Sequence, residues 1–174
     1  MKQIRIVEII YQPFYAAEST LYHVCPYCLK VYRQRWYILG HCEELKGIRH
    51  FSLDRIQHVD ITETRFDYPS SFSPEAYYKD SIGIWVNEEI KPEKVIIRAY
   101  GTQSKYLRTL PLHHSQKETY TSDEYCDFEY QLCVTQNLIS ELLAKGKTIQ
   151  VMEPESLRLE MKKCLYSMFN FYKL

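Results

Sequence analysis

Short strand-like runs divide the first third of the chain, and this division constrains the fold more than any other feature. The runs are rich in β-branched and aromatic residues and cover residues 4–11, 21–26, 29–32, 35–41, 48–52 and about 57–65. Gln12-Pro13 ends the first run, and a polar turn before Ile48 separates two of the later ones. Short strands separated by turn signals at this spacing are typical of small β-barrels. The sequence therefore predicts a small, closed or partly closed barrel over residues 1–66.

The last third of the chain alternates between strand-like and helical patterns. Strands are expected at 93–99, 115–120, 128–134 and 148–152, and helices at 103–109, around 138–146 and at 155–169. The order βαββαβ followed by a helix predicts a ferredoxin-like sandwich over residues 93–174. Residues 67–92 break both patterns and are expected to form a linker, with a short helix beginning at Ser73-Pro74. The predicted fold class is α+β, with an SH3-like or Sm-like barrel followed by a ferredoxin-like α/β sandwich.

The pair Arg33-Gln34 is expected to form the two-residue turn of a hairpin. In that register Tyr32 lies opposite Arg35 and Lys30 opposite Tyr37, and directly opposed residues share a face. One face is apolar and is expected to pack on the core: Leu29, Val31, Trp36 and Ile38. The other face is basic and aromatic: Lys30, Tyr32, Arg35 and Tyr37. A slip of one residue would scramble the two sets, so the register is itself a hypothesis.

The basic aromatic face can form a pocket for a flat, anionic ligand, together with Arg49 and Arg55 from neighbouring segments. Aromatic rings stack on bases, and guanidinium groups pair with phosphates. A different interpretation is that such side chains serve solubility and cross-strand packing, and that Asp54-Arg55 is a local structural pair. The pattern alone leaves both interpretations open.

The charge balance restricts the partners that the chain can have. It holds 22 Lys and Arg against 22 Asp and Glu, so any nucleic-acid contact has to come from a local patch. No run of about 18 apolar residues is present, and we therefore expect no membrane span. The segment Met1-Lys2-Gln3-Ile4-Arg5 is too charged for a signal peptide, so the six cysteines are expected to be reduced thiols in the cytoplasm.

Two patterns that contain cysteine resemble functional sites, one for thiol redox catalysis and one for zinc binding. Each lacks a feature that such a site needs. Cys25-Pro26-Tyr27-Cys28 has the sequence of a glutaredoxin active site, where a thiol is activated at a helix N-terminus. Here the residues that follow are expected to be extended, and a thiol oxidoreductase is the weaker alternative function. A closed zinc site needs four converging ligands, but His41 and Cys42 are neighbours on one strand and point to opposite faces. We therefore expect no metal, no cofactor, no catalytic residue and no enzymatic activity.

The motifs of the first third resemble the WYL domain of bacterial transcriptional regulators. The matching residues lie between about 4 and 66 and are Tyr11, His23-Val24-x-Pro26-x-x-Leu29, Trp36-Tyr37-Ile38 and Arg49-x-Phe51-x-x-Asp54-Arg55-Ile56. Two residues depart from the family pattern. His23 stands where an arginine is common, which weakens anion binding at neutral pH, and Ile38 replaces the Leu of the family name.

The resemblance implies a sensor that binds a nucleotide or a single-stranded nucleic acid and passes the signal to a helix-turn-helix module. It implies a ligand-binding site made of Tyr11, His23, Lys30, Arg35, Tyr37, Arg49, Phe51 and Arg55. Because strands are expected from Ile4 onwards, no helix-turn-helix fits in this chain, and DNA contact is expected only through a module outside it. The C-terminal domain is expected to mediate homodimerisation, as such extensions do in related regulators. The alternative is an accessory module that binds single strands directly without acting as a switch.

Overall fold

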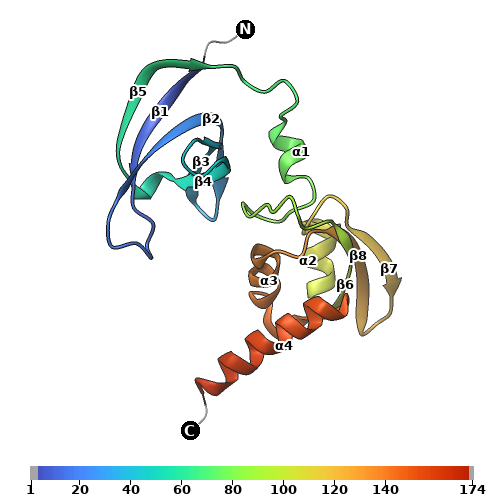
Figure 1. Ribbon diagram of the computed structural model, residues 1–174. Helices are drawn as coiled ribbons and strands as arrows, with labels where there is room; N and C mark the ends of the chain where they lie inside the picture. The colour runs from blue at the N-terminus through green and yellow to red at the C-terminus, as the bar shows by residue number, and fades with distance from the viewer. Residues whose placement is uncertain (1–3, 173–174) are drawn as a thin grey trace. The chain divides into compact units, whose positions relative to one another are not determined.

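The computed structural model describes residues 4–172 and divides into two compact units, Met1–Tyr77 and Tyr78–Leu174 (Figure 1). Each unit contains one antiparallel sheet, and four α-helices lie within the described residues. The chain is therefore a mixed α+β protein, as the sequence predicts. None of the helices in the described part is long and apolar enough to cross a membrane.

The N-terminal unit is built on a five-stranded sheet with the order β4-β3-β2-β1-β5. Its elements are β1 (Ile4–Tyr11), β2 (Thr20–Tyr32), β3 (Arg35–Cys42), β4 (Gly47–Ser52), the 3₁₀-helix η1 (Leu53–Arg55) and β5 (Ile56–Phe66). All neighbouring strands are antiparallel. Within residues 4–172 no strand pairing joins β4 to β5, so the sheet is open. Of the closed or partly closed barrel that the sequence predicts, the closed form is absent among these residues.

Strand β2 is one long strand where the sequence predicts two short ones. It continues through Pro26, and its register against β3 shifts between Pro26 and Cys28. A bulge tolerates proline, which cannot donate to the ladder, so the strand bends there instead of ending. Gly40 lies opposite Pro26, and a Cβ at Gly40 would come within 2.4 Å of the Cys25 carbonyl oxygen. The close approach of the two strands therefore requires glycine at position 40.

The hairpin between β2 and β3 has the predicted register. Tyr32 lies opposite Arg35, Val31 opposite Trp36, Lys30 opposite Tyr37 and Leu29 opposite Ile38. The turn residues Arg33 and Gln34 have φ values of 46° and 66°. Both lie in the left-handed region, as the two central residues of a type I′ turn do. The turn geometry thus matches the twist of the strands even though the sequence lacks the usual Asn-Gly.

The burial predicted for the apolar face of this hairpin is wrong for three of its four residues. Leu29, Val31 and Trp36 are 58%, 51% and 52% exposed, and among the four only Ile38 packs against the core. The core consists of Ile9, Tyr11, Val24, Cys42 and Phe51. It lies where β1, β2, β3 and β4 overlap, whereas β1 pairs with β2 only over residues 20–24. The hairpin end extends beyond that overlap, so its apolar side chains have no strand to pack against.

The opposite face of the hairpin is partly covered by the segment that follows β5. Aromatic rings of this segment contact the sheet, with ring centroids 4.7 Å apart for Tyr27 and Phe72 and 6.3 Å apart for His50 and Tyr77. The segment ends in the short helix α1 (Pro74–Tyr78). His50 lies on the same face as Tyr37, which is only 9% exposed. The face expected to be open to a ligand is therefore partly closed.

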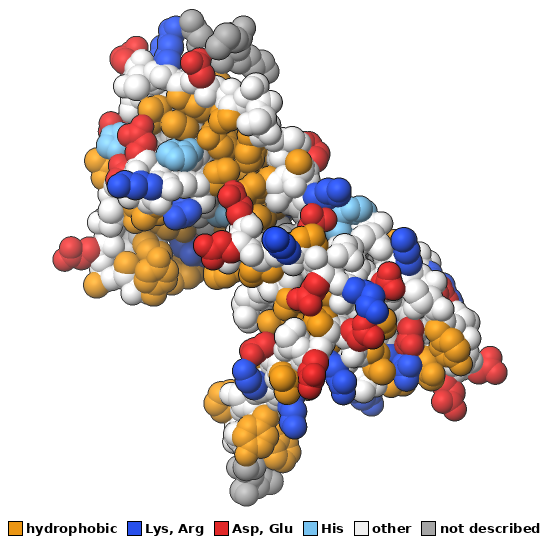
Figure 2. Space-filling model, turned by 45° about the vertical axis from the view of Figure 1, so that its right-hand side comes forward, with side chains coloured by type: hydrophobic (Ala, Val, Ile, Leu, Met, Phe, Trp, Pro, Cys, Tyr) orange, Lys and Arg blue, Asp and Glu red, His pale blue; other side chains and the backbone are white. Residues whose placement is uncertain are grey.

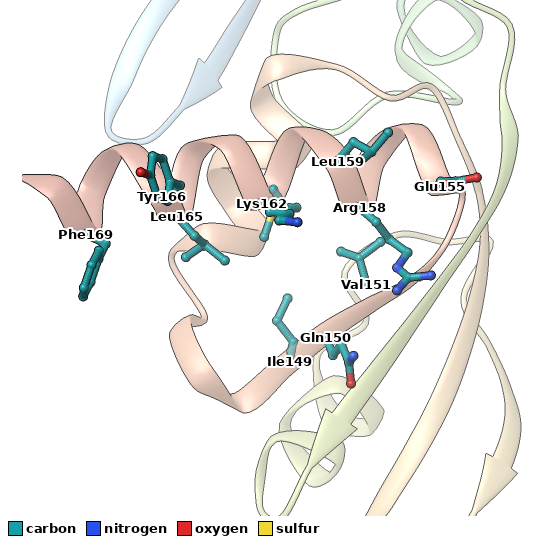
Figure 3. Close-up of a pocket in the computed structure, with 11 residues that line it drawn as sticks. Ile149, Gln150, Val151, Glu155, Arg158, Leu159, Lys162, Leu165, Tyr166 and Phe169 are labelled. Atoms are coloured by element: carbon teal, nitrogen blue, oxygen red, sulfur yellow. The ribbon is translucent and has the colours of Figure 1, made fainter.

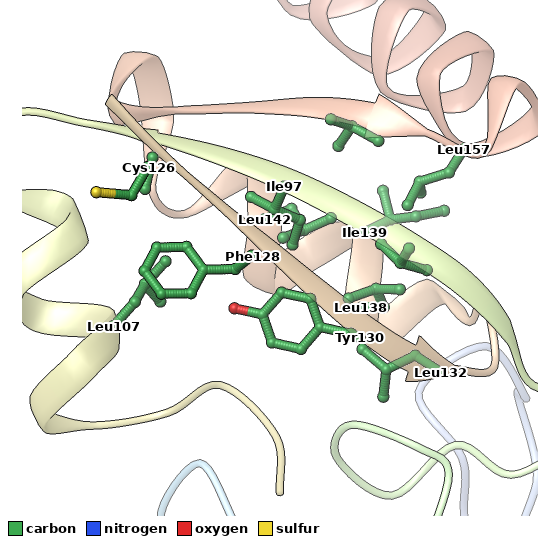
Figure 4. Close-up of a cluster of buried hydrophobic side chains, with 13 residues drawn as sticks. Ile97, Leu107, Cys126, Phe128, Tyr130, Leu132, Leu138, Ile139, Leu142 and Leu157 are labelled. Carbon is green, nitrogen blue, oxygen red and sulfur yellow. The ribbon is translucent and has the colours of Figure 1, made fainter. Parts of the chain in front are cut away.

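The C-terminal unit has a four-stranded antiparallel sheet with the order β7-β8-β6-β9. Its elements are β6 (Glu93–Tyr100), α2 (Gln103–Thr109), β7 (Lys117–Thr121), β8 (Tyr125–Leu132), α3 (Gln136–Leu143), the 3₁₀-helix η2 (Gly146–Thr148), β9 (Ile149–Glu153) and α4 (Glu155–Asn170). This is the predicted order βαββαβ followed by a helix. Figure 4 shows Phe128 and Tyr130 of the sheet together with Leu138 and Leu142 of α3, all in one buried cluster.

Candidate functional site

Arg55 forms a cluster with aromatic residues from other parts of the N-terminal unit. Its Nη1 donates a long hydrogen bond of 3.5 Å to the hydroxyl of Tyr11, at the end of β1. The Tyr11 ring meets the Phe51 ring of β4 edge-on, with centroids 5.2 Å apart, and the Tyr22 ring of β2 contacts both. The guanidinium of Arg55 also lies over the ring of Phe14, 4.2 Å from its centroid. Three of the predicted residues, Tyr11, Phe51 and Arg55, are thus brought together from β1, β4 and η1.

Arg35 lies at the start of β3 and is joined to η1 by an ion pair. Its Nη1 donates to Asp54 Oδ2 at 2.5 Å, and the Ser52 hydroxyl donates to the other carboxylate oxygen of Asp54. The hydrogen bond from Ser52 and the charge of Arg35 lower the pKa of the Asp54 carboxyl. Both partners of the ion pair are almost half exposed. A ligand phosphate can therefore reach Arg35 but has to compete with Asp54.

Lys30 and Tyr37 are directly opposed in the sheet, and Ser52 of β4 lies opposite Tyr37 on its other side. Burial lowers the pKa of the Lys30 amine. Burial and the nearby charge of Lys30 lower the pKa of His50 to about 4, so the imidazole is neutral at physiological pH. Lys30 is therefore a partly buried cation on the covered face of the sheet. The ring of Tyr37 is buried and has little surface left for a ligand.

His23 is held between two carboxylates. Its Nδ1 lies 2.6 Å from Glu44 Oε1, and its Nε2 lies 3.3 Å from Glu8 Oε1. The hydrogen bond with Glu44 raises the pKa of His23. Burial alone would raise the pKa of Glu44, but its hydrogen bonds with His23 lower it to about 2. When His23 is protonated, its charge is therefore balanced by carboxylates of the same protein.

Arg49 stabilises the turn between β3 and β4. Its guanidinium donates to the carbonyl oxygens of Ile48 at 2.8 Å and Leu45 at 3.0 Å. No contact described within residues 4–172 joins Arg49 or His23 to Arg55. The eight predicted residues therefore fall into a group around η1, the Lys30–Tyr37 pair, and two residues with separate structural partners.

Sequence patterns did not indicate three residues that take part in these contacts: Phe14, Tyr22 and His50. Phe14 lies in the loop between β1 and β2, beside Pro13 and Tyr15. Phe14 and Tyr15 are 76% and 93% exposed. Two adjacent aromatic residues in a loop next to a predicted basic site are the signal that could have identified Phe14.

The two cysteines of the Cys25-Pro26-Tyr27-Cys28 motif lie within strand β2 and not at the start of a helix. Burial raises the pKa of both thiols. An activated thiol needs a lowered pKa, which a helix N-terminus or a nearby cation provides. The geometry therefore opposes thiol catalysis at this motif. In the described part of the chain, no group of three or more His, Cys, Asp or Glu side chains could hold a metal ion.

A hollow of about 660 Å³ lies in the C-terminal unit between β9 and α4 (Figure 3). Its wall is mostly apolar, with Ile149 and Val151 from β9 and Leu165 and Phe169 from α4, and Arg158 and Lys162 add positive charge. Figure 2 shows hydrophobic side chains gathered towards the C-terminal end of α4. None of the eight predicted site residues lines this hollow.

Comparison with protein families matches residues 1–61 to the WYL domain. No curated protein is found to be similar to the chain. Among solved structures, a CRISPR Cas-related protein is 11% identical, with a TM-score of 0.56 over 97% of this chain and 48% of that one. The proteasome accessory factor B/C (PafBC) of Arthrobacter aurescens is 18% identical, with a TM-score of 0.41 over 90% of this chain and 24% of that one.

These two structures are both longer than this chain, which spans about half of the first and about a quarter of the second. At such low identity the likeness to the CRISPR Cas-related protein concerns the fold alone.

Proposed function

Because residues 1–61 match the WYL domain family, we propose that the chain is a non-enzymatic, ligand-sensing region of a bacterial transcriptional regulator. The effector is a nucleotide or a single-stranded nucleic acid. The observation that carries this proposal is the cluster of Arg55 with Tyr11 and Phe51, because it joins a cation to aromatic rings inside the matched domain. Such a combination suits a ligand with a planar base and a phosphate.

The predicted site residues have different roles in this proposal. Arg55 binds the phosphate first, because its guanidinium has one long hydrogen bond to a neutral hydroxyl. Arg35 and Lys30 add positive charge beside it, although Arg35 has to exchange Asp54 for the ligand. Tyr11, Tyr37 and Phe51 form the aromatic wall. Arg49 and His23 are the peripheral members, since each has to leave its present partners before it can contact a ligand.

The finer architecture is also part of the proposal. We interpret the open five-stranded sheet of the N-terminal unit as an SH3-like or Sm-like barrel that is incompletely closed. The strand order β7-β8-β6-β9 with two crossover helices supports a ferredoxin-like sandwich for the C-terminal unit. The protein acts in the cytoplasm as a homodimer, and DNA is contacted only by a helix-turn-helix module that is not in this chain.

A thermal-shift experiment tests the sensor function. Nucleotides and short single-stranded oligonucleotides that bind the folded protein raise its melting temperature. We expect Arg55→Ala to weaken the binding by at least about tenfold, since a hydrogen bond to a charged group is worth about 1.5–3 kcal/mol. Arg5→Ala is the control, because Arg5 belongs to the same unit, lies outside the predicted site and has its guanidinium in an ion pair with Glu63. Equal binding by both variants, or no binding by the wild type, would contradict the proposal.

The alternative is an accessory module that grips single strands without acting as a switch. The exposed apolar side chains at the end of the β2–β3 hairpin favour it, because Trp36, Val31 and Leu29 offer an open surface to unpaired bases. Oligonucleotide binding through many phosphates weakens steeply as salt rises, whereas binding of a mononucleotide weakens less. A salt titration of both ligands therefore distinguishes the two functions.

A further inference from the structure

The loop between β1 and β2 is folded tightly against η1. The Gln12 backbone amide donates to the carbonyl of Arg55 at 3.2 Å, and the Gln12 side chain donates to the carbonyls of Ala16 and Ala17. The Gln57 side chain in turn donates to Gln12 Oε1 at 2.8 Å. The loop is thereby fixed at both of its ends. The backbone on either side of Phe14 is therefore joined to the sheet and across the loop by hydrogen bonds.

Phe14 is held over Arg55 with most of its ring in water. The guanidinium carbon of Arg55 lies 4.2 Å from the centroid of the ring, and the Phe14 side chain is still 76% exposed. One ring face is therefore stacked on a cation while the rest of the ring is free. An exposed ring backed by a guanidinium is the arrangement on which a nucleobase stacks.

The guanidinium of Arg55 has few hydrogen-bond acceptors among the described residues. Within the described residues its buried Nε has no acceptor, and its Nη1 reaches only the Tyr11 hydroxyl at 3.5 Å. A guanidinium has five N–H donors, and buried donors without a partner are rare in folded proteins. The unpaired donors of Arg55 can therefore bind an anionic acceptor beside the Phe14 ring.

We infer that Phe14 is the base-recognition residue of this site. The ligand is a nucleotide, free or at the end of a single strand. Its base stacks on the exposed face of Phe14, and its phosphate accepts hydrogen bonds from Arg55. This inference rests on the proposed sensor function and adds the specificity element that the family motifs omit, since Phe14 lies outside all of them.

Titration calorimetry with two probes tests the inference: adenosine 5′-monophosphate, which has a base, and inorganic pyrophosphate, which has none. We expect Phe14→Ala to weaken binding of the nucleotide by about 5- to 150-fold, the range for loss of one base–aromatic stack. Binding of pyrophosphate stays within about twofold of the wild type, whereas Arg55→Ala weakens both probes. Tyr15→Ala is the matched control, because Tyr15 belongs to the same loop and is 93% exposed.

The Phe14→Trp variant provides a second measurement that does not depend on the alanine variant being well folded. A base stacked on the new indole quenches its fluorescence, measured as a difference from the wild-type signal of Trp36 and Trp85. We expect quenching by the nucleotide and none by pyrophosphate.

The outcomes separate the two proposals. If the wild type binds the nucleotide and Phe14→Ala binds it equally well, or if the new indole is not quenched, Phe14 has no role in recognition but the sensor function stands. If the wild type binds neither probe, the inference about Phe14 is wrong. If it also binds none of the nucleotides and oligonucleotides of the thermal-shift experiment, the sensor function is wrong as well.

Discussion

At the scale of single residues, His23 illustrates how one change alters what a site can bind. The resemblance to WYL domains places an arginine at this position, and arginine would remain charged at any physiological pH. His23 instead forms hydrogen bonds or ion pairs with Glu44 and Glu8. The two carboxylates supply the negative charge that a ligand phosphate would otherwise provide. The chain therefore has an ion pair within the protein at a position where the resemblance implies a residue that binds an anion.

This ion pair gives the stability of the N-terminal unit a dependence on pH. The pKa of His23 is raised in the folded protein, so its contribution is complete below about 6.5 and is lost as the pH rises through the folded value. The pKa of Glu44 is lowered to about 2, so its contribution is complete above about 4.5 and is lost on acidification towards pH 2. The pair stabilises the fold most between about pH 4.5 and 6.5.

We expect His23→Gln to abolish the part of this dependence above pH 6.5. Urea denaturation at pH 5.5 and pH 8.5 should show that the variant loses about 0.5–1 kcal/mol at the lower pH and little at the higher one, as for a partly exposed ion pair. Glu44→Gln should remove most of the same dependence, the rest coming from Glu8. The double variant should lose less than the sum of the two single losses. A His23→Gln profile parallel to that of the wild type would show that the pair is not coupled to folding.

At the scale of secondary-structure elements, the hairpin of β2 and β3 separates what the sequence can predict from what it cannot. Its register follows from the two-residue turn and the alternation of side chains, and it is confirmed. The burial of its apolar face is not a property of the hairpin. This burial depends on where the neighbouring strands end, which cannot be predicted from a local sequence pattern. Trp36 is exposed because β1 pairs with β2 only over residues 20–24. Likewise, the two strands predicted on either side of Pro26 form one continuous strand, because a bulge accommodates the proline.

The same distinction applies to the candidate site. Tyr11, Phe51 and Arg55 were identified from the spacing of the family motifs, and they are in contact. The partners that occupy the charged groups could not be identified in this way. Glu44 approaches His23 from a turn 21 residues away, and Phe14 reaches Arg55 from a loop 41 positions earlier in the sequence. Such contacts depend on the tertiary fold and not on periodicity.

The turn of this hairpin allows a direct test of its geometry. Gln34 has a φ of 66°, where a side chain with Cβ costs about 1 kcal/mol relative to glycine. We expect Gln34→Gly to be more stable than Gln34→Ala by about that amount. Denaturation followed by the fluorescence of Trp36, in a Trp85→Phe background, reports on this unit. Equal stability of the two variants would mean that the turn does not have the type I′ geometry.

At the scale of the whole molecule, the surface of the C-terminal unit determines whether the proposed homodimer can form. Helix α4 is buried on its inner side through Leu157 but exposes Leu165, Tyr166 and Phe169 by 53%, 62% and 61%. Leu165 and Phe169 also line the hollow beside β9. Association of two copies through a twofold axis buries the same surface on each, so one apolar helix face can satisfy both partners.

We expect the Leu165→Glu and Phe169→Glu double variant to be monomeric where the wild type is dimeric, because the charges would be buried without partners in the interface. Light scattering coupled to size-exclusion chromatography measures the mass directly. Met168→Glu is the control, since Met168 is an exposed apolar residue of the same helix that does not line the hollow. The control should remain a dimer. A monomeric wild type would refute the homodimer. A dimeric double variant would show that the dimer interface does not include α4, and the exposed face of this helix would then be available to a different partner.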